Sequence, residues 1–325
     1  MEVIKNIISH SLDISKYFGD ETVCFLDIET TGLSRDKNVI YLIGVLYLEG
    51  TAWILKQYFA NSIAKEKDLL VQFISDISSF GKIITYNGDS FDLPFINHRL
   101  MHHQINSNIS KDKSFDIYRI VKNNKQYLEL ENLKLKTIEL ALGFEREDIY
   151  SGLDCIGFYY DYIKSNNKLM KDNTLKHNYD DLVHMLDIIT ILDIIDDKKT
   201  IILGSPSNVI KFSIDNIVTN GDLLNINGTI SNPLDSNIKY FGENYNLITE
   251  DLNKFTISLE IKKGYISEKD KCRYIETNDF PNIDDLVDSS GYKLPTNIIL
   301  LMVGNKYCIP NIKNLLTKIL EAIVI

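Results

Sequence analysis

The chain has 325 residues, 44% of them hydrophobic, so it is long enough for two domains that each bury a core. No apolar run is long enough to cross a bilayer, and residues 1–20 lack the basic start and apolar centre of a signal peptide, so we expect a soluble, cytoplasmic protein with no membrane partner. The four cysteines form no C-x-x-C pattern, which argues against a zinc or redox motif, and the net charge of −10 argues against a broad basic surface.

The first 200 residues alternate between patterns typical of strands and of helices. We expect a short amphipathic helix within residues 1–20. Apolar stretches predict strands over residues 22–27, 39–48, 52–59, 82–86 and 114–117. Helical spacing of apolar residues predicts helices over residues 65–80, 94–103, 132–142 and 178–195. A hairpin followed by alternating strands and helices implies an α/β fold with a mixed five-stranded sheet flanked by helices.

The composition changes near residue 200. The stretch L-G-S-P-S at residues 203–207 is typical of a linker. Beyond it, period-two stretches at residues 208–214 and 255–261 and Asn-Gly pairs at residues 220–221 and 227–228 predict strands and tight turns. A last helix is expected over residues 309–323. We therefore divide the chain into a domain of residues 1–200 and a smaller β-rich accessory domain of residues 201–325, whose role the sequence does not indicate.

Two acids stand at the end of the strand expected over residues 22–27. Asp27 and Glu29 are two residues apart, so their side chains point to the same face of a strand. Two carboxylates on one face repel each other unless a cation lies between them, and hard oxygen ligands of this kind suit Mg²⁺ or Mn²⁺. The alternative is an exposed strand end with two solvated acids.

A third acid follows the strand expected over residues 82–86. The stretch N-G-D-S-F-D-L-P-F at residues 87–95 contains a turn with glycine and then Asp92 just ahead of a helix. Phe91 and its apolar neighbours would anchor the turn in the core and hold Asp92 at the edge of the sheet. The alternative is that Asp92 is the N-cap of the helix, although Asp89 or Ser90 could take that position instead.

The last acids, Asp180 and Asp181, are adjacent in the stretch H-N-Y-D-D at residues 177–181. Neighbouring residues cannot share one face of a helix, and helical spacing from Asp181 leads to apolar residues, so Asp181 is the inward acid. His177 lies four residues earlier, on the same face and one turn away. The alternative is a polar first turn in which the helix dipole favours both acids, and this is the better interpretation for Asp180.

The three acid clusters lie on different elements and can converge on two metal ions. Two cations about 4 Å apart can activate a water and stabilise the departing oxygen in phosphodiester hydrolysis. A carboxylate-rich site of this kind is itself acidic until cations fill it, which weakens the argument from the negative net charge against a nucleic-acid substrate.

With these motifs in place, the sequence resembles the DEDD (DnaQ-like) 3′–5′ exonucleases of the ribonuclease H-like superfamily, and among them the YprB-type branch. The stretches D-I-E-T-T-G-L at residues 27–33, N-G-D-S-F-D-L-P-F at residues 87–95 and H-N-Y-D-D at residues 177–181 match the three motifs in order. The resemblance covers roughly residues 22–195. It implies a ribonuclease H-like fold and four metal-binding acids, which are Asp27, Glu29, Asp92 and Asp181.

One position departs from the family pattern. The tyrosine subclass has a Tyr four residues before the last Asp, where this chain has His177, and the histidine subclass has a His five residues before, where this chain has Lys176. His177 is still a candidate general base, because the ordinary pKa of about 6.5 suits that task. The alternative is that it serves the fold through a hydrogen bond.

The candidate substrate-binding residues are Thr30, Asn87, Phe91 and Lys136. Lys136 would contact a phosphate or pair with an acid of the site, and a solvated helix lysine is the alternative. We expect a 3′–5′ exonuclease that uses two Mg²⁺ or Mn²⁺ ions on single-stranded DNA or RNA. The rival hypothesis is a nucleic-acid-binding or scaffold protein that keeps the fold with little turnover.

Overall fold

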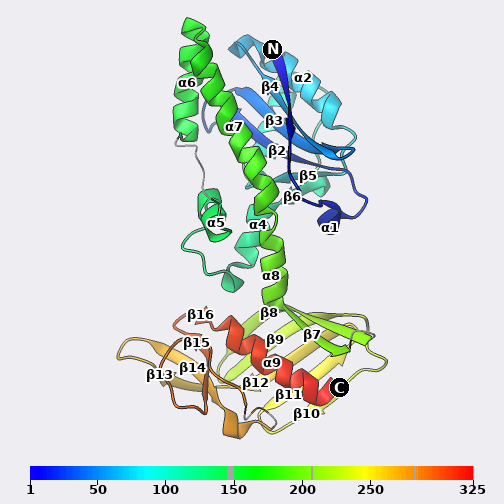
Figure 1. The fold of residues 1–325 in the computed structure, drawn as a ribbon, viewed down its shortest axis with the longest axis vertical. Helices are drawn as coiled ribbons and strands as arrows, with labels where there is room; N and C mark the ends of the chain where they lie inside the picture. Colours follow the sequence, from blue (N-terminus) through cyan, green and yellow to red (C-terminus); the bar gives the residue numbers. More distant parts are fainter. Residues whose placement is uncertain (145–149, 206–207, 282, 284, 325) are drawn as a thin grey trace. The chain divides into compact units, whose positions relative to one another are not determined.

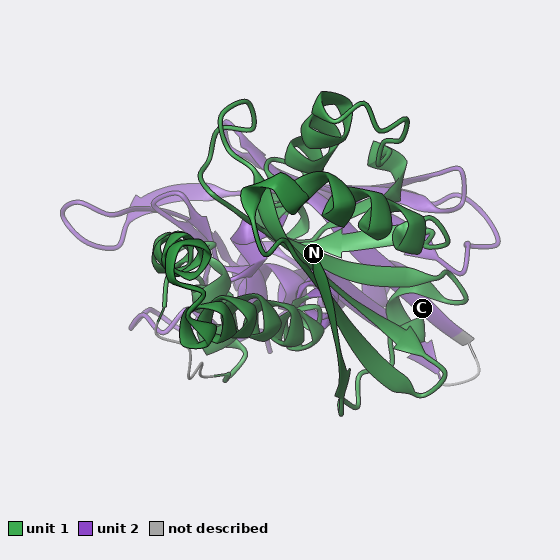
Figure 2. Cartoon of the chain, turned by 90° about the horizontal axis from the view of Figure 1, so that it is seen from above, with its two compact units in different colours: residues 1–123, 130–191 green, residues 124–129, 192–325 purple. Residues whose placement is uncertain are grey.

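The computed structural model describes residues 1–144, 150–205, 208–281, 283 and 285–324, which form two compact units. Unit 1 comprises residues 1–123 and 130–191, and unit 2 comprises residues 124–129 and 192–325 (Figures 1 and 2). No helix among the described residues has both the length and the apolar content needed to span a membrane.

Unit 1 is built on one mixed sheet of six strands in the order β1-β4-β3-β2-β5-β6. The pairs β2–β5 and β5–β6 are parallel and the other pairs are antiparallel. The strands are β1 (Glu2–Ile8), β2 (Val23–Thr30), β3 (Ile40–Glu49), β4 (Ala52–Phe59), β5 (Lys82–Thr85) and β6 (Ser114–Asp116). The predicted α/β class with a mixed sheet is confirmed, with one strand more than the five expected.

The additional strand is β1, in the segment for which we expected a helix. That expectation was wrong for residues 2–8, which pair antiparallel with β4 from Glu2 opposite Phe59 to Ile8 opposite Trp53. Within residues 1–22, all of which the structure describes, the only helix is the single turn α1 (Ser15–Phe18). The open edge of β4 supplies the hydrogen bonds that decide the conformation, and the paired residues lie 45 residues or more apart along the chain.

The four predicted helices occur in the predicted order, but the one expected over residues 178–195 is divided in two, and the helices Ile117–Asn123 and Gly152–Ser165 were not predicted. The last long helix, α7, begins at Lys168, ten residues before the expected start, and ends at Ile188, so His177 and both adjacent acids lie in its interior. The remaining helices up to residue 199 are α2 (Glu66–Ile77), α3 (Asp92–His102), α4 (Ile117–Asn123), α5 (Leu135–Ala141), α6 (Gly152–Ser165) and α8 (Ile191–Lys199). Short 3-10 turns are η1 (Ile63–Lys65), η2 (Lys111–Lys113) and η3 (Lys125–Tyr127).

Helices cover both faces of this sheet. Ile28, Ile43 and Tyr58 form a row across β2, β3 and β4, and Tyr58 meets Phe73 of α2 with ring centroids 6.0 Å apart. Residues one position away point to the opposite face. On that face α7 runs across β2 and β3, close to Gly44 (Figure 1). The face under α7 therefore carries the side chains of Asp27 and Glu29.

Unit 2 is an antiparallel β structure with one long helix. Its larger sheet has the order β10-β11-β12-β9-β8-β7 and its smaller sheet the order β13-β14-β15-β16. The strands are β7 (Thr200–Ser205), β8 (Asn208–Asn220), β9 (Leu223–Ser231), β10 (Lys239–Phe241), β11 (Tyr245–Glu250), β12 (Lys254–Glu260), β13 (Lys262–Tyr265), β14 (Lys271–Glu276), β15 (Ile298–Val303) and β16 (Lys306–Tyr307), with the turn η4 (Thr277–Asp279). The helix is α9 (Ile309–Val324), close to the predicted range.

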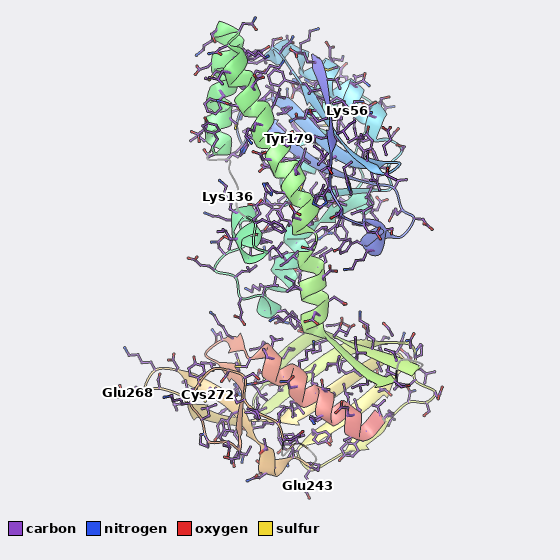
Figure 3. All side chains as sticks on the ribbon, viewed as in Figure 1. Lys56, Lys136, Tyr179, Glu243, Glu268 and Cys272 are labelled. Carbon is purple, nitrogen blue, oxygen red and sulfur yellow. The ribbon has the colours of Figure 1, made fainter. Side chains whose placement is uncertain are left out.

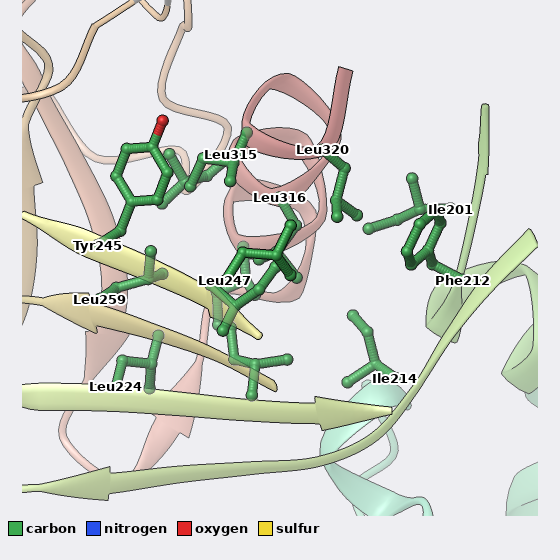
Figure 4. Close-up of a cluster of buried hydrophobic side chains, with 14 of the residues drawn as sticks. Ile201, Phe212, Ile214, Leu224, Tyr245, Leu247, Leu259, Leu315, Leu316 and Leu320 are labelled. Atoms are coloured by element: carbon green, nitrogen blue, oxygen red, sulfur yellow. The ribbon is translucent and has the colours of Figure 1, made fainter. Parts of the chain in front are cut away.

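The core of unit 2 lies between α9 and the larger sheet. Leu315, Leu316 and Leu320 of α9 point toward the sheet, on the sides of Tyr245, Leu247 and Phe212 respectively (Figure 4). The predicted β-rich character of this region is confirmed. The expected linker is not, because residues 203–205 belong to β7, and residues 206–207 of the predicted linker lie outside the described residues.

One of the two predicted Asn-Gly turns exists. Gly221 has φ +62° in the turn between β8 and β9. The second pair lies inside β9 and forms no turn, so that prediction was wrong. A side chain at Gly228 would place its Cβ 2.2 Å from the backbone oxygen of Ser213 and 2.4 Å from the ring of Phe255. This glycine is needed for close packing, which a sequence cannot distinguish from a need for a turn.

Candidate metal-binding active site

The first two acids lie where β2 passes under α7. Their two-residue spacing on a strand puts Asp27 and Glu29 on one face, as the sequence predicts. Glu29 is buried, with 8% of its surface exposed, and Asp27 is half-buried. The hydroxyl of Tyr41 donates a long hydrogen bond of 3.4 Å to Oε2 of Glu29.

The third acid reaches this face from the loop after β5. Asp92 is the first residue of α3, and its Oδ1 accepts a hydrogen bond of 3.2 Å from the backbone N–H of Ile28. The N-cap position belongs to Phe91, and no side chain caps the helix there. The structure therefore contradicts the N-cap alternative for Asp92 and places its carboxylate beside β2.

The loop before Asp92 is held by another buried acid, Asp116 at the end of β6. Its carboxylate accepts hydrogen bonds from the backbone N–H of Asn87 at 2.9 Å and of Asp89 at 3.1 Å. Asn87 has φ +68°, in the left-handed region that Asn tolerates better than most residues. Asp116 thus fixes the turn that carries Asp92 to the site. Nothing in the local sequence marks it for this role.

Helix α7 supplies the remaining groups. Nε2 of His177 lies 3.8 Å from Oε1 of Glu29 and 3.7 Å from Oδ2 of Asp181. Asp180 points elsewhere and pairs with Lys176 at 2.7 Å. The assignment of Asp181 as the inward acid agrees with this geometry, and the alternative of a polar first turn does not, because α7 begins at Lys168.

These groups form one cluster, which we call the carboxylate cluster: Asp27, Glu29, Asp92 and Asp181. Single ligand atoms of Glu29, His177 and Asp181 all lie within 4.8 Å of one another. The cluster thus joins three segments that are distant in sequence. Such a group of carboxylate oxygens with one imidazole nitrogen can hold a divalent cation.

Burial and mutual repulsion raise the pKa values of three acids of the cluster, Asp27, Glu29 and Asp92. Burial raises the pKa of Asp27 well above its ordinary value, and the charges of Asp181, Glu29 and Asp92 add to the effect. The pKa of Glu29 rises to about 8, mainly through burial, although the nearby His177 opposes the rise. The pKa of Asp92 rises to about 7, again mainly through burial. A dication at this position would offset both the burial and the repulsion, so the residues present fit a metal ion.

The sequence interpretation missed two residues that support this cluster, one by direct contact and one through the other. Asn178 is completely buried, and its Nδ2 donates to Oδ2 of Asp27 at 2.7 Å. Gln57 of β4 donates in turn to Oδ1 of Asn178 at 2.8 Å. The position of Asn178 inside the H-N-Y-D-D stretch was a signal that could have pointed to it. Gln57 stands in an ordinary strand and carries no such signal.

The candidate substrate-binding residues lie in different environments. Thr30 is buried, and its hydroxyl donates to the backbone oxygen of Gly32 at 2.9 Å. Phe91 packs against Phe95, with ring centroids 5.5 Å apart. Lys136 is exposed on α5 (Figure 3). Its solvated position agrees with either of the interpretations drawn from the sequence.

Comparison with known proteins identifies the family to which the chain is similar. A family model described as the RNase H superfamily matches residues 24–193. Together with the mixed sheet of unit 1, this match confirms the ribonuclease H-like fold predicted from the sequence. No curated protein matches the chain in sequence.

Among solved structures, the chain is similar to the family B DNA polymerase from the hyperthermophilic archaeon Pyrobaculum calidifontis, with 12% sequence identity and a TM-score of 0.42. The similarity covers 53% of this chain and 24% of that chain, so it spans about a quarter of the polymerase.

Proposed function

Because the chain belongs to the RNase H superfamily, we propose that it is a metal-dependent 3′–5′ exonuclease of the DEDD type, in the YprB-type branch, that hydrolyses single-stranded DNA or RNA. The observation that carries the proposal is the convergence of Glu29, His177 and Asp181 from two distant segments, with Asp27 and Asp92 beside them. We assign the activity to residues 1–200 and an accessory role to residues 201–325.

The four acids of the carboxylate cluster are the proposed ligands of two Mg²⁺ or Mn²⁺ ions. Such ions supply an activated water and charge stabilisation at the departing oxygen. Asp27 would be the ligand common to both ions, Glu29 and Asp181 would hold the ion on the side of the attacking water, and Asp92 would support the other. The raised pKa values of Asp27, Glu29 and Asp92 support this role, because a cation would stabilise the charged forms of these three carboxylates.

His177 is the proposed general base. It lies next to Glu29 and Asp181, so a water held by these acids is within reach of Nε2. We further propose that Thr30, Asn87, Phe91 and Lys136 contact the substrate strand near the scissile phosphate.

A second function follows from two specific observations. His177 replaces the tyrosine of the family motif, and the net charge of −10 is unfavourable for binding long nucleic acids. Both favour a protein that binds nucleic acid or a partner and keeps the fold with little turnover. The full set of four acids favours the exonuclease.

The two functions are separated by a nuclease assay with Mn²⁺ on short, end-labelled single strands of DNA and RNA. An exonuclease shortens the linear strands stepwise from the 3′ end, and a 3′-terminal phosphorothioate linkage slows the reaction. The Asp27→Ala protein, purified in the same way, controls for contaminating nucleases. A circular strand cut as quickly as the linear one would indicate an endonuclease, and no cleavage of any strand would favour the scaffold.

A further inference from the structure

A row of three residues crosses the sheet directly beneath α7. Asp27 on β2 pairs with Gly44 on β3, and Gly44 pairs with Gln57 on β4. Residues in register on neighbouring strands point to the same face. The middle position has no side chain, so a gap separates the carboxylate of Asp27 from the amide of Gln57.

Asn178 of α7 fills that gap. A Cβ atom at Gly44 would lie 2.3 Å from Oδ1 of Asn178 and 2.3 Å from Cδ1 of Leu182, so the glycine allows the helix to approach. Asn178 has no exposed surface. A buried primary amide must satisfy both its donor and its acceptor, and here the two partners lie on either side of it.

Across this row, Gln57 donates to Asn178 and Asn178 donates to Asp27. Gln57 donates through Nε2 to two carbonyl oxygens, the backbone oxygen of Leu175 at 2.8 Å and Oδ1 of Asn178 at 2.8 Å. Asn178 therefore turns its NH₂ group toward Asp27. It donates to Oδ2 of Asp27 at 2.7 Å and makes a longer contact of 3.4 Å to the backbone oxygen of Asp27. The backbone oxygen of Leu175 can only accept, so it fixes the orientation of the Gln57 amide. The Gln57 amide in turn fixes the orientation of the Asn178 amide.

We propose that Asn178 and Gln57 are positioning residues for Asp27 and that this pair sets the affinity of the site for its divalent cation. The inference rests on the proposed function in taking Asp27 as a metal ligand. The amide holds Oδ2, which fixes the plane of the carboxylate and presents the remaining lone pairs of Asp27 to the cluster. Hydrogen bonds from such supporting groups typically account for about 10- to 100-fold in metal affinity or activity.

The test measures Mn²⁺ binding to the full-length protein by calorimetry, together with thermal unfolding in the absence of metal. Asn178→Leu removes the amide at similar volume and is expected to weaken Mn²⁺ binding about 10- to 100-fold. Gln57→Leu does not touch Asp27, yet it frees the amide of Asn178 to rotate, so a smaller loss in the same direction is expected. The matched control is Thr174→Val, because Thr174 is fully buried on α7 and its hydroxyl donates only to Met170 of the same helix.

The Gln57→Glu variant distinguishes the effect of the orientation of the Asn178 amide from the effect of an added negative charge. A carboxylate at residue 57 cannot donate, so it would accept from Nδ2 of Asn178 and turn the amide oxygen toward Asp27. An added negative charge by itself would attract the cation. Weaker Mn²⁺ binding by Gln57→Glu than by Gln57→Leu therefore supports the positioning role, and tighter binding overturns it. If Asn178→Leu does not fold, the two Gln57 variants decide the question.

The outcomes separate this inference from the proposed function. Wild-type affinity in both Asn178→Leu and Gln57→Leu would overturn the inference, whatever the nuclease assay shows. Wild-type protein that binds Mn²⁺ and cuts no strand would overturn the exonuclease and leave the positioning role supported by the variants. Wild-type protein that binds no Mn²⁺ would overturn both, because Asp27 would then not be a ligand.

Discussion

The carboxylate of Asp92 accepts a hydrogen bond of 3.2 Å from the backbone N–H of Ile28, the residue between Asp27 and Glu29. Strand β5 pairs with β2 only as far as Phe25, so Ile28 lies beyond the last paired residue. A side chain that arrives 64 residues later supplies this acceptor. This hydrogen bond to the backbone of β2 holds Asp92 beside Asp27 and Glu29, so the carboxylates of both motifs can bind one ion.

The stability of the metal-free protein is expected to depend on pH through this cluster. Asp92 and Glu29 have folded pKa values of about 7 and about 8, above their ordinary values of 3.8 and 4.5. Between about pH 4 and pH 8 the folded state holds protons that the unfolded state has released, so the free energy of unfolding falls as pH rises. Each such proton contributes about 1.4 kcal/mol per pH unit.

Urea unfolding in EDTA at several pH values measures this slope. The Asp92→Asn protein should show a shallower slope, because one of the titrating groups is gone. Asp180→Asn is the control, since Asp180 pairs with Lys176 outside the cluster. Equal slopes for wild type and Asp92→Asn would contradict the expectation.

Removal of Asp27 is expected to abolish tight Mn²⁺ binding and to leave the fold intact. The carboxylate is proposed as the ligand that both ions share, and its loss also relieves repulsion from Asp181, Glu29 and Asp92. Calorimetry and thermal unfolding in EDTA would show no Mn²⁺ binding by Asp27→Ala and a cooperative unfolding transition of the metal-free protein. Asp180→Ala should bind like wild type. Equal affinity in wild type and Asp27→Ala would rule out Asp27 as a ligand.

Replacement of His177 by Ala is expected to lower turnover by roughly 10²-fold, the usual effect of losing general acid–base help. Mn²⁺ affinity should change little, because the imidazole is proposed to act on the water. His177→Tyr should keep part of the activity and lose the acid limb of the pH profile that imidazole protonation gives the wild type. A large loss of Mn²⁺ affinity in His177→Ala would instead make His177 a ligand.

A buried ion pair holds the loop that follows β2. Glu66 of α2 accepts from Arg99 of α3 at 2.6 Å and from the backbone N–H of Ile40 at 2.8 Å, and only about 1% of its side chain is exposed. Arg99 also donates a longer hydrogen bond of 3.4 Å to the backbone oxygen of Arg35. Arg99→Leu removes one of two side-chain partners of Glu66, the other being His103 at 2.7 Å, so the cost is expected at or below the about 3–5 kcal/mol of a broken buried pair.

Urea unfolding of Arg99→Leu measures that cost. The double variant Glu66→Leu with Arg99→Leu is the control, because it removes both charges and should recover much of the stability. A single variant as stable as wild type would show that the pair does not hold the loop.

Residues 1–199 are expected to fold alone. They contain the whole six-stranded sheet and the cluster of buried residues around Leu26 and Phe73, separate from the core of unit 2. Tyr127 packs in the core of unit 2 and would become exposed. Circular dichroism and thermal unfolding of the truncated protein should show native secondary structure and one cooperative transition. An unfolded fragment would mean that the C-terminal part completes the fold.

Local patterns predicted much of the sheet and of the candidate site. Strand β4 was expected over residues 52–59 and occupies Ala52–Phe59. The two-residue spacing of Asp27 and Glu29 was enough to place both acids on one face, and the apolar residues at helical spacing from Asp181 were enough to turn it inward. These features could be predicted because buried positions recur every second residue in a strand and every three or four residues in a helix. That pattern is visible in a short stretch of sequence.

Other features depended on partners far along the chain. The segment Glu2–Ile8 became a strand because β4 offers an open edge, and Asn178 meets Gln57 across 121 residues. Gly44 and Gly228 are glycines because a neighbouring element comes within 2.3 Å of where a Cβ would stand. A sequence determines which faces are apolar and which residues share a face. Only the folded chain decides which distant groups satisfy each buried donor and acceptor, because hydrogen bonds act over about 3 Å of space and not over positions in the sequence.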